Sequence, residues 1–484
     1  MGKVQFLLST VVLLLFAAGI SSFHNKTSTS VRNPSPDTTI LPAFAKATDH
    51  QARNSAAKNG LITLTFGLDN DFYLLDSATR RGYLYLETAV DRFQHETLKK
   101  VPLNISIVID RSGSMAGEKI EFARKAAAGI IDQLSPEDFV SVVMYDEFID
   151  VLQPSTAVLY KDSIKAKLNK VKPRGSTNVW GGSEKGYEQV KAAYRKNYVN
   201  RVLLISDGNI TAGIKIPSRI IEKVQAYKDI EGITISTFGV GLDYNETLMT
   251  AMAESGSGNY YFIDRADKMA AIFNKELNGL QNVVAQNAEL HIVLPKGVTV
   301  EKIYPFKYSQ VKNEVVIRFQ DLFSEEKKSL VMQFRLEDNV SKDLSFVAKL
   351  AYTNAANNQP GLVQTASGLL PTKNREAYLS HFNKYVAEQV MLFAANENME
   401  SAMYEVDRGH YEAARRYVEA AGYYFERSAG YIAGSRELQK MDSLWRYYAS
   451  DLSKLKAFTA DTLKHIQKTQ RAVNYQLRNK KQPE

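Results

Sequence analysis

Apolar positions between about residue 101 and residue 285 follow two alternating patterns. Short apolar runs rich in β-branched residues predict buried strands, with two further strands at 150–152 and 259–263. Between them, apolar residues recur at spacings of three and four, which predicts amphipathic helices. Strands that alternate with helices indicate an α/β fold with a doubly wound, mostly parallel sheet. The buried strands are expected at 103–109, 139–144, 201–205 and 233–239, and the helices at 119–134, 163–171, 180–194, 218–227 and 268–284.

The segments on either side of this region follow other patterns. Apolar and polar residues alternate across 286–356, which predicts a small antiparallel β-sandwich. Residues 59–100 carry strand signals too, and they either belong to this sandwich, with the α/β domain inserted into it, or form strands of their own. From residue 370 to residue 484, helix-forming residues and spacings of three and four predict an α-helical domain.

The N-terminus has the pattern of an export signal. Lys3 precedes an apolar stretch from residue 6 to residue 20, and the small residues Ser21 and Ser22 follow it. The stretch is short for a membrane span, which needs about 20 apolar residues. We therefore expect a signal peptide over 1–22, export to the periplasm or cell surface, and a flexible linker over 23–58. The alternative is an uncleaved signal anchor, and we expect an attachment to the membrane only in that case.

Composition excludes several kinds of site. The chain has 484 residues, enough for several domains. It contains no cysteine, which excludes disulfides, thiolate zinc sites and thiol nucleophiles. The formal net charge of +8 is modest for this length and is not concentrated near the polar motif described next, so we expect no nucleic-acid partner.

Three oxygen-bearing side chains follow the apolar run at 103–109. Asp110, Ser112 and Ser114 are two residues apart and leave the end of this predicted strand together. One carboxylate and two hydroxyls suit a hard divalent cation such as Mg²⁺, which prefers oxygen ligands. So few carboxylates leave the metal short of ligands, and a partner's carboxylate can supply the last one. The alternative is a structural turn in which Ser112 and Ser114 only cap the following helix.

Two further loops end where they can join this motif. Thr177 lies in the loop before the helix expected at 180–194, and Asp207 follows the strand at 201–205. In a doubly wound sheet, ligands bind at the carboxyl ends of the strands where the strand order reverses. The sequence therefore predicts a metal site formed by Asp110, Ser112, Ser114, Thr177 and Asp207.

Together these motifs resemble the von Willebrand factor type A family with its metal-ion-dependent adhesion site. Residues 109–115, 175–178 and 206–208 carry the resemblance, and the segments at 238–241 and 256–261 extend it. It implies such a domain over 101–285, in an exported bacterial protein of several domains. It also implies that Ser112, Ser114 and, with ligand bound, Thr177 coordinate the ion directly, whereas Asp110 and Asp207 act partly through water. The expected ion is Mg²⁺, with Mn²⁺ or Ca²⁺ as alternatives.

These features predict a non-enzymatic adhesion or assembly module that binds an Asp or Glu of a protein partner through the metal. A metal-dependent hydrolase is one alternative, but a serine nucleophile needs an activating base. No histidine occurs between His95 and His291, so the α/β domain brings no imidazole. Another alternative is an accessory component of a membrane transport or channel complex, although no apolar stretch after the signal is long enough to span a bilayer.

Overall fold

The computed structural model describes residues 54–478, except 78–79, 93–100, 208–209, 264, 266–267, 428–433, 453 and 455–458. The expected signal peptide and most of the expected linker lie outside these described residues. The linker prediction was wrong at its C-terminal end, because strand β1 (Ser55–Asn59) begins inside it and pairs with β2 (Ile62–Leu68).

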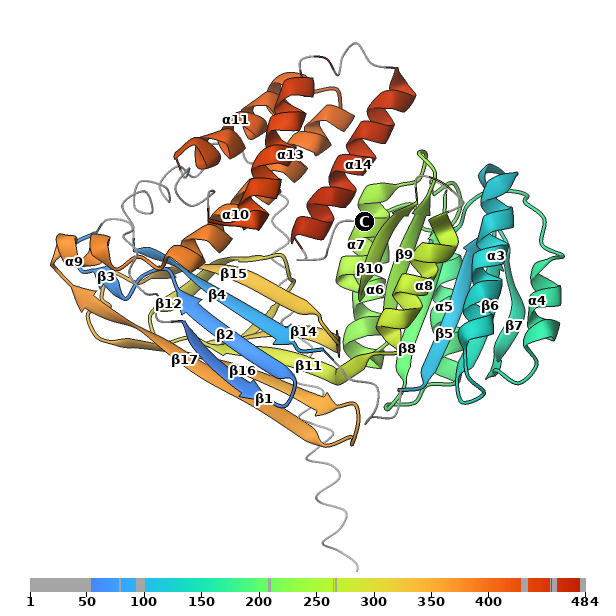
Figure 1. Cartoon of the computed structure of the whole chain (residues 1–484), viewed down its shortest axis with the longest axis horizontal. Helices are drawn as coiled ribbons and strands as arrows, with labels where there is room; N and C mark the ends of the chain where they lie inside the picture. Colours follow the sequence, from blue (N-terminus) through green and yellow to red (C-terminus); the bar gives the residue numbers. More distant parts are fainter. Residues whose placement is uncertain are drawn as a thin grey trace, which may run out of the picture. The chain divides into compact units, whose positions relative to one another are not determined.

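A six-stranded sheet forms the centre of the α/β domain and confirms the predicted fold class (Figure 1). Neighbouring strands are parallel, except that the last strand is antiparallel to its neighbour. The chain passes from β5 to β6 on one side and then returns to β8 on the other side of β5, so the strand order reverses at β5. In spatial order the strands are β10 (Ser257–Ile263), β9 (Thr234–Val240), β8 (Val199–Ser206), β5 (Leu103–Asp110), β6 (Phe139–Tyr145) and β7 (Ile149–Ala157).

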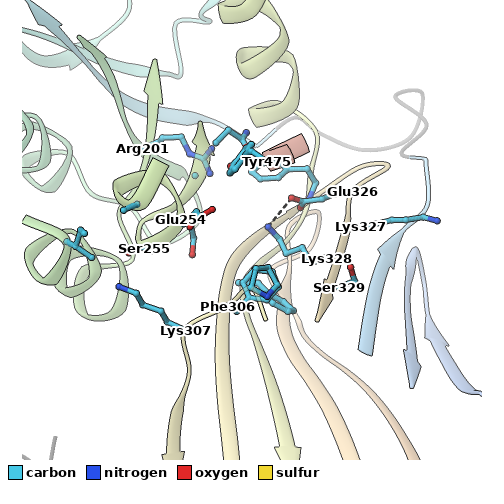
Figure 2. A pocket seen from close by; sticks show the side chains of 18 residues that line it. Arg201, Glu254, Ser255, Phe306, Lys307, Glu326, Lys327, Lys328, Ser329 and Tyr475 are labelled. Carbon is cyan, nitrogen blue, oxygen red and sulfur yellow. Dashed lines mark hydrogen bonds and ion pairs between the residues drawn. The ribbon is translucent and has the colours of Figure 1, made fainter. Parts of the chain in front are cut away.

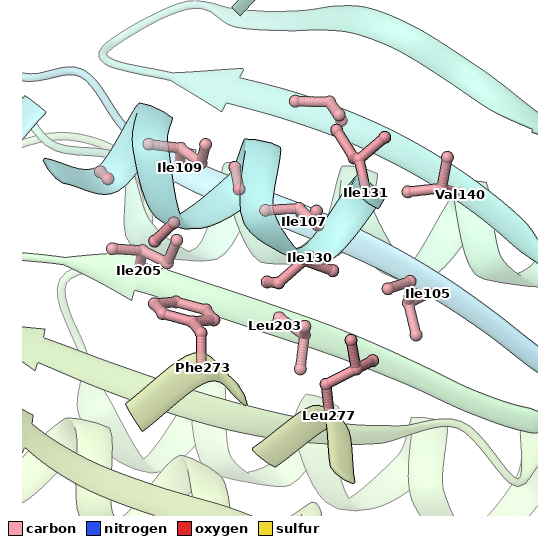
Figure 3. Packing of buried hydrophobic residues seen from close by; sticks show 14 of the residues in the cluster. Ile105, Ile107, Ile109, Ile130, Ile131, Val140, Leu203, Ile205, Phe273 and Leu277 are labelled. Carbon is pink, nitrogen blue, oxygen red and sulfur yellow. The ribbon is translucent and has the colours of Figure 1, made fainter. Parts of the chain in front are cut away.

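Helices cover both faces of this sheet because its strands are apolar on both sides. On one face, Ile105, Ile107 and Ile109 of β5 pack against Ile130 of α3 and Phe273 of α8 (Figure 3). The alternate residue Val108 belongs to the core on the other face. The first face carries α3 (Glu118–Gln133), α4 (Lys161–Leu168) and α8 (Met269–Leu280), and the second carries α5 (Val179–Ala192), α6 (Pro217–Glu231) and α7 (Glu246–Ser255).

Two helix predictions need correction. The helix expected over 268–284 ends at Leu280, and strand β11 (Val283–Val293) begins three residues later, because the apolar residues after Leu280 pair with a neighbouring strand instead of continuing the helix. Helix α7 was not predicted, although its buried residues Leu248, Met249, Met252 and Ala253 recur at spacings of three and four. Its N-cap is Asn245, whose side chain accepts a hydrogen bond from the Leu248 amide at 3.1 Å.

Two mostly antiparallel sheets share a second core and form the β-sandwich. Strand β4 (Arg81–Val90), which precedes the α/β domain, pairs antiparallel with β15 (Lys327–Leu336), which follows it. The α/β domain is therefore inserted between strands of one sheet. The sandwich also extends past residue 356, because β17 (Pro360–Thr372) pairs with β16 (Leu344–Asn354). The other strands are β3 (Phe72–Leu74), β11 (Val283–Val293), β12 (Val298–Tyr304), β13 (Ser309–Val311), β14 (Glu314–Phe323) and β16 (Leu344–Asn354).

The C-terminal part is helical and has its own apolar core. Its first two long helices meet at Gly409, which adopts a positive φ of 75° that suits glycine. Among the described residues, no helix has the length and apolar character needed to cross a membrane. The helices are α9 (Arg375–Ser380), α10 (Lys384–Asp407), α11 (Tyr411–Arg427), α13 (Arg436–Leu452) and α14 (Ala460–Arg478).

Candidate metal centre

The polar motif lies at the point where the strand order of the α/β sheet reverses. Asp110 is the last residue of β5, and Asp207 directly follows Ser206, the last residue of the neighbouring β8. Thr177 lies two residues before α5. Since β5 and β8 are parallel, their carboxyl ends meet at one edge, as expected for a ligand site in such a sheet.

Asp110 organises the loop that follows β5. One of its carboxylate oxygens accepts a hydrogen bond from the Ser112 amide at 2.7 Å. The other accepts from the hydroxyls of Ser206 at 2.7 Å and Tyr145 at 3.3 Å. These bonds turn the chain sharply at the end of the strand and direct the next hydroxyls toward β8.

The hydroxyls of Ser112 and Ser114 lie 3.1 Å apart. The Ser114 hydroxyl also donates to Asp207 Oδ1 at 2.8 Å, while Ser112 and Asp207 are buried. Neither serine caps the following helix: Ser112 makes no side-chain cap hydrogen bond, and the residue at the N-cap of α3 is Gly117. The helix-cap alternative was therefore wrong, and the Ser112 hydroxyl instead contacts the Ser114 hydroxyl, which bonds to the buried carboxylate of Asp207.

Thr177 is held beside this cluster mainly by its backbone. Its amide donates to the Thr211 hydroxyl at 2.7 Å, and its carbonyl accepts from the amides of Thr211 and Ala212, both at 3.1 Å. The loop that carries it meets the serine loop where the Gly113 amide donates to the Gly175 carbonyl at 3.1 Å. Hydrogen bonds thus join Asp110, Ser112, Ser114 and Asp207 directly, whereas Thr177 is linked through the neighbouring backbone.

A buried carboxylate fixes these two loops to each other. Asp146 accepts from Arg111 Nε at 2.9 Å and from Arg174 Nε at 2.7 Å, so it ties the serine loop to the threonine loop. Burial alone would raise the pKa of Asp146, but hydrogen bonds from Arg174, the Phe148 amide and Arg111 hold it below its usual value. A fixed spacing between the loops is what a site with ligands on both requires.

Lys119 is a site residue that sequence reasoning missed. Its ammonium forms an ion pair with Asp207 Oδ2 and donates to the Ser114 carbonyl at 3.2 Å. Gly241, with a φ of 82°, leaves room for it, since a Cβ there would lie 3.1 Å from Lys119 Cε. The lysine is in the first turn of α3, five residues after Ser114, but nothing in the sequence pairs it with a residue 88 positions away.

The donor set fits a hard divalent cation. It consists of hydroxyl and carboxylate oxygens, and among the described residues no group of three or more His, Cys, Asp or Glu is placed to hold a metal. Such oxygen donors suit Mg²⁺ or Ca²⁺ rather than zinc, which usually takes His or Cys ligands. The ion pair between Lys119 and Asp207 also indicates that this buried carboxylate is stabilised by a positive charge beside it.

We expect Mg²⁺ affinity to fall as the pH is lowered through about 6. Burial raises the pKa of Asp110 to about 6, against the hydrogen bonds from Ser112 and Ser206. Proton and metal compete for this carboxyl, so the affinity should fall roughly tenfold per pH unit below that value and level off above it. Isothermal titration of Mg²⁺ across this range checks the expectation, and a constant affinity would contradict it.

The same shift has a consequence for the stability of the metal-free protein. Because the pKa of Asp110 is raised on folding, the neutral carboxyl is the form that folding favours. Its contribution to the free energy of unfolding is therefore present below the ordinary value of 3.8 and is lost as the pH rises through about 6.

Comparison with known proteins agrees with this fold. The model of the von Willebrand factor type A domain matches residues 104–275, and the chain contains a domain of this family. The von Willebrand factor type A protein from Catenulispora acidiphila has a similar fold, with a TM-score of 0.63 at 16% identity over 81% of this chain and 91% of that one.

Two curated relatives share part of the chain. YfbK of Escherichia coli is 31% identical over 214 residues, which cover 44% of this chain and 37% of YfbK. Inter-alpha-trypsin inhibitor heavy chain H4 of Bos taurus is 23% identical over 290 residues, which cover 57% of this chain and 30% of that protein. The chain thus spans about a third of the length of each relative.

Proposed function

We propose that this chain is a non-enzymatic protein-binding module of the cell envelope that captures an acidic residue of its partner through a divalent metal. Ser112, Ser114 and Thr177 would hold the ion directly, with Asp110 and Asp207 acting partly through water. Mg²⁺ is the proposed ion. Location in the envelope follows from the export signal proposed for residues 1–22.

The observation that carries the proposal is the pair of hydroxyls at Ser112 and Ser114 beside the buried Asp207 carboxylate, at the reversal point of the sheet. Only two carboxylates belong to the cluster, so a bound Mg²⁺ keeps ligand positions and positive charge for an outside carboxylate. The heavy chain of inter-alpha-trypsin inhibitor supports the same class of role, since its name makes it one chain of a larger protein assembly.

A catalytic role has less support. The Ser114 hydroxyl donates to a carboxylate that is itself paired with Lys119, and residues 96–290 contain no histidine to act as a base. We therefore propose that the serines are ligands rather than nucleophiles.

Affinity capture from the native envelope tests the proposal. The full chain is immobilised and exposed to envelope extract with Mg²⁺ or with EDTA. We expect Mg²⁺-dependent capture of a partner, lost with EDTA and restored by excess Mg²⁺. Asp110→Ala and Ser114→Ala should both abolish capture, because each removes a proposed oxygen donor or its organiser.

Asp162→Ala is the matched control. Asp162 lies in α4, and its side chain is 99% exposed, so its loss should leave capture unchanged. Capture that persists in EDTA and in both site variants would sink the proposal. Mutating the acidic residues of the captured partner then tests whether one of its carboxylates completes the metal site.

A further inference from the structure

An open groove of about 810 Å³ lies beside the first turns of α3 in the α/β domain. One wall consists of α3 and the two residues before it, and the other consists of residues 169–173, which follow α4. Both helices pack on the same face of the sheet. The volume of the groove is in the range of ligand sites in proteins, so it can hold a short segment of another chain.

Both walls of this groove lead to the proposed metal centre. The wall on α3 begins at Ala116, two residues after the proposed ligand Ser114. The other wall ends at Pro173, and the amide of the next residue, Arg174, donates to the Arg111 carbonyl at 2.7 Å. A partner chain that gives a carboxylate to the metal can therefore continue directly into the groove.

Arg124 joins the two walls to each other. Its Nη1 donates to the carbonyls of Asn169 at 3.2 Å and Val171 at 3.0 Å, both on the wall that follows α4. The same guanidinium forms an ion pair with Glu121, one turn earlier on α3. Because these bonds already hold the walls apart, a bound segment would meet a preformed groove.

The wall that follows α4 belongs to a basic run. Residues 163–183 contain five Lys or Arg and no Asp or Glu. Three of these cations bond within the fold, since Lys165 and Arg174 form ion pairs with carboxylates and Lys167 donates to an amide oxygen. Lys172 is exposed and lines the groove, and within the part of the chain that the structure describes its ammonium has no ion-pair partner.

The other charges on the groove are balanced locally. Glu121 pairs with the Arg124 that joins the walls, and the ammonium of Lys125 lies 5.3 Å from the centroid of the Phe122 ring. Glu118 is in the first turn of α3, where the positive end of the helix dipole offsets a negative charge. An acidic ligand would therefore find Lys172 available.

The cavity in Figure 2 differs in this respect. Its volume is about 250 Å³, and two of the cations on its lining already have carboxylate partners. Lys328 pairs with Glu326 at 2.9 Å, and Arg201 pairs with Glu276 at 2.9 Å. Paired charges of this kind give no reason to expect a charged ligand there.

We propose that the groove beside α3 binds an extended acidic segment of the partner protein. The inference rests on the metal-dependent capture proposed above and adds a second contact, in which Lys172 pairs with another Asp or Glu of the same segment. In an extended chain, side chains two and four residues away point to the same side as the first, at about 7 and 13 Å. The second acidic residue should therefore follow or precede the metal-binding one by two or four residues.

Ligand-observed NMR on the full chain with Mg²⁺ tests this contact with glycine–serine octapeptides. One peptide carries a single aspartate, and two others carry a second aspartate two or four residues away. We expect one of the two-aspartate peptides to bind about three- to tenfold tighter at low salt, from an exposed ion pair and a statistical factor of about two. The gain should shrink as salt is raised, because exposed charges are screened.

Lys172→Gln should lower the ratio of the two affinities to about the statistical value. Lys170→Gln is the matched control, since Lys170 is exposed in the same basic run but does not line the groove. The ratio is measured within each variant, so a loss of folded protein lowers both affinities alike. A ratio that Lys172→Gln leaves unchanged, or that Lys170→Gln lowers equally, would overturn the groove assignment.

Two further outcomes separate this assignment from the metal-dependent capture on which it rests. If the peptides bind with Mg²⁺ and are released by EDTA, but the second aspartate adds no more than the statistical factor, the metal site stands and the groove assignment is wrong. If no peptide binds with Mg²⁺, carboxylate capture at the metal is contradicted, and the groove assignment fails with it.

Discussion

Replacing Arg201 by Met is expected to lower the free energy of unfolding of the α/β domain by about 3–5 kcal/mol. Arg201 and Glu276 form an ion pair at 2.9 Å in which each side chain is only 1% exposed. Burial alone would raise the pKa of Glu276, yet Arg201, Asn259, Ser236 and Tyr261 together hold it below its usual value. Without the arginine, a buried carboxylate remains with neutral donors only.

Urea unfolding followed by the fluorescence of Trp180 in α5 measures this loss, with Trp445→Phe introduced in every variant so that one tryptophan reports. The double variant Arg201→Met with Glu276→Gln is the control. It removes both charges and keeps an acceptor for the neighbouring donors, so it should recover part of the loss. If the free energy of unfolding of Arg201→Met lies within about 1 kcal/mol of that of the parent protein, a stabilising role for the ion pair is contradicted.

The architecture of the α/β domain could be predicted because local patterns determine it. Strands buried on both faces and helices with one apolar face leave different periodicities, and the alternation of the two defines a parallel sheet. The positions of Asp110 and Asp207 followed from the same logic, since both come directly after such strands. The proximity of these residues is therefore a property of strand order, which the sequence carries.

Contacts between distant segments could not be predicted in this way. The ion pair of Lys119 with Asp207 joins a helix to a strand end, and the pairing of β4 with β15 joins segments on opposite sides of the inserted domain. Neither leaves a local pattern. The helix expected over 268–284 failed for a related reason, because the apolar residues after Leu280 fit a strand as well as a helix until their pairing partner is known.

Because Lys119 forms this ion pair, we expect it to control how tightly the proposed metal centre binds its ion. Its ammonium lies against Asp207 Oδ2, while Asp207 Oδ1 accepts from the proposed ligand Ser114. A metal ion bound at the serines would meet this positive charge at short range and would compete with it for the same carboxylate. Two like charges a few ångströms apart near a protein surface interact by several kcal/mol at most.

Lys119→Met is therefore expected to tighten Mg²⁺ binding by about 10- to 100-fold, the equivalent of about 1.4–2.8 kcal/mol. In EDTA the same variant should be less stable than the parent, since Asp207 is fully buried and loses its cation. Isothermal titration of Mg²⁺ and thermal unfolding in EDTA measure the two effects. Tighter Mg²⁺ binding together with lower stability in EDTA would identify Lys119 as a cation that competes with the metal. A lysine that contributes only packing would not produce these two opposite effects.

Lys125→Met is the matched control, because Lys125 lies on the same helix with its ammonium 5.3 Å from the centroid of the Phe122 ring rather than at the metal centre. It should change neither the affinity nor the stability in EDTA by more than a small amount. If the parent protein binds no divalent ion, the proposed metal centre itself is wrong. If parent and Lys119→Met bind Mg²⁺ equally, the centre stands and Lys119 does not compete for it, so the charge balance around Asp207 must then be set by the metal's other ligands.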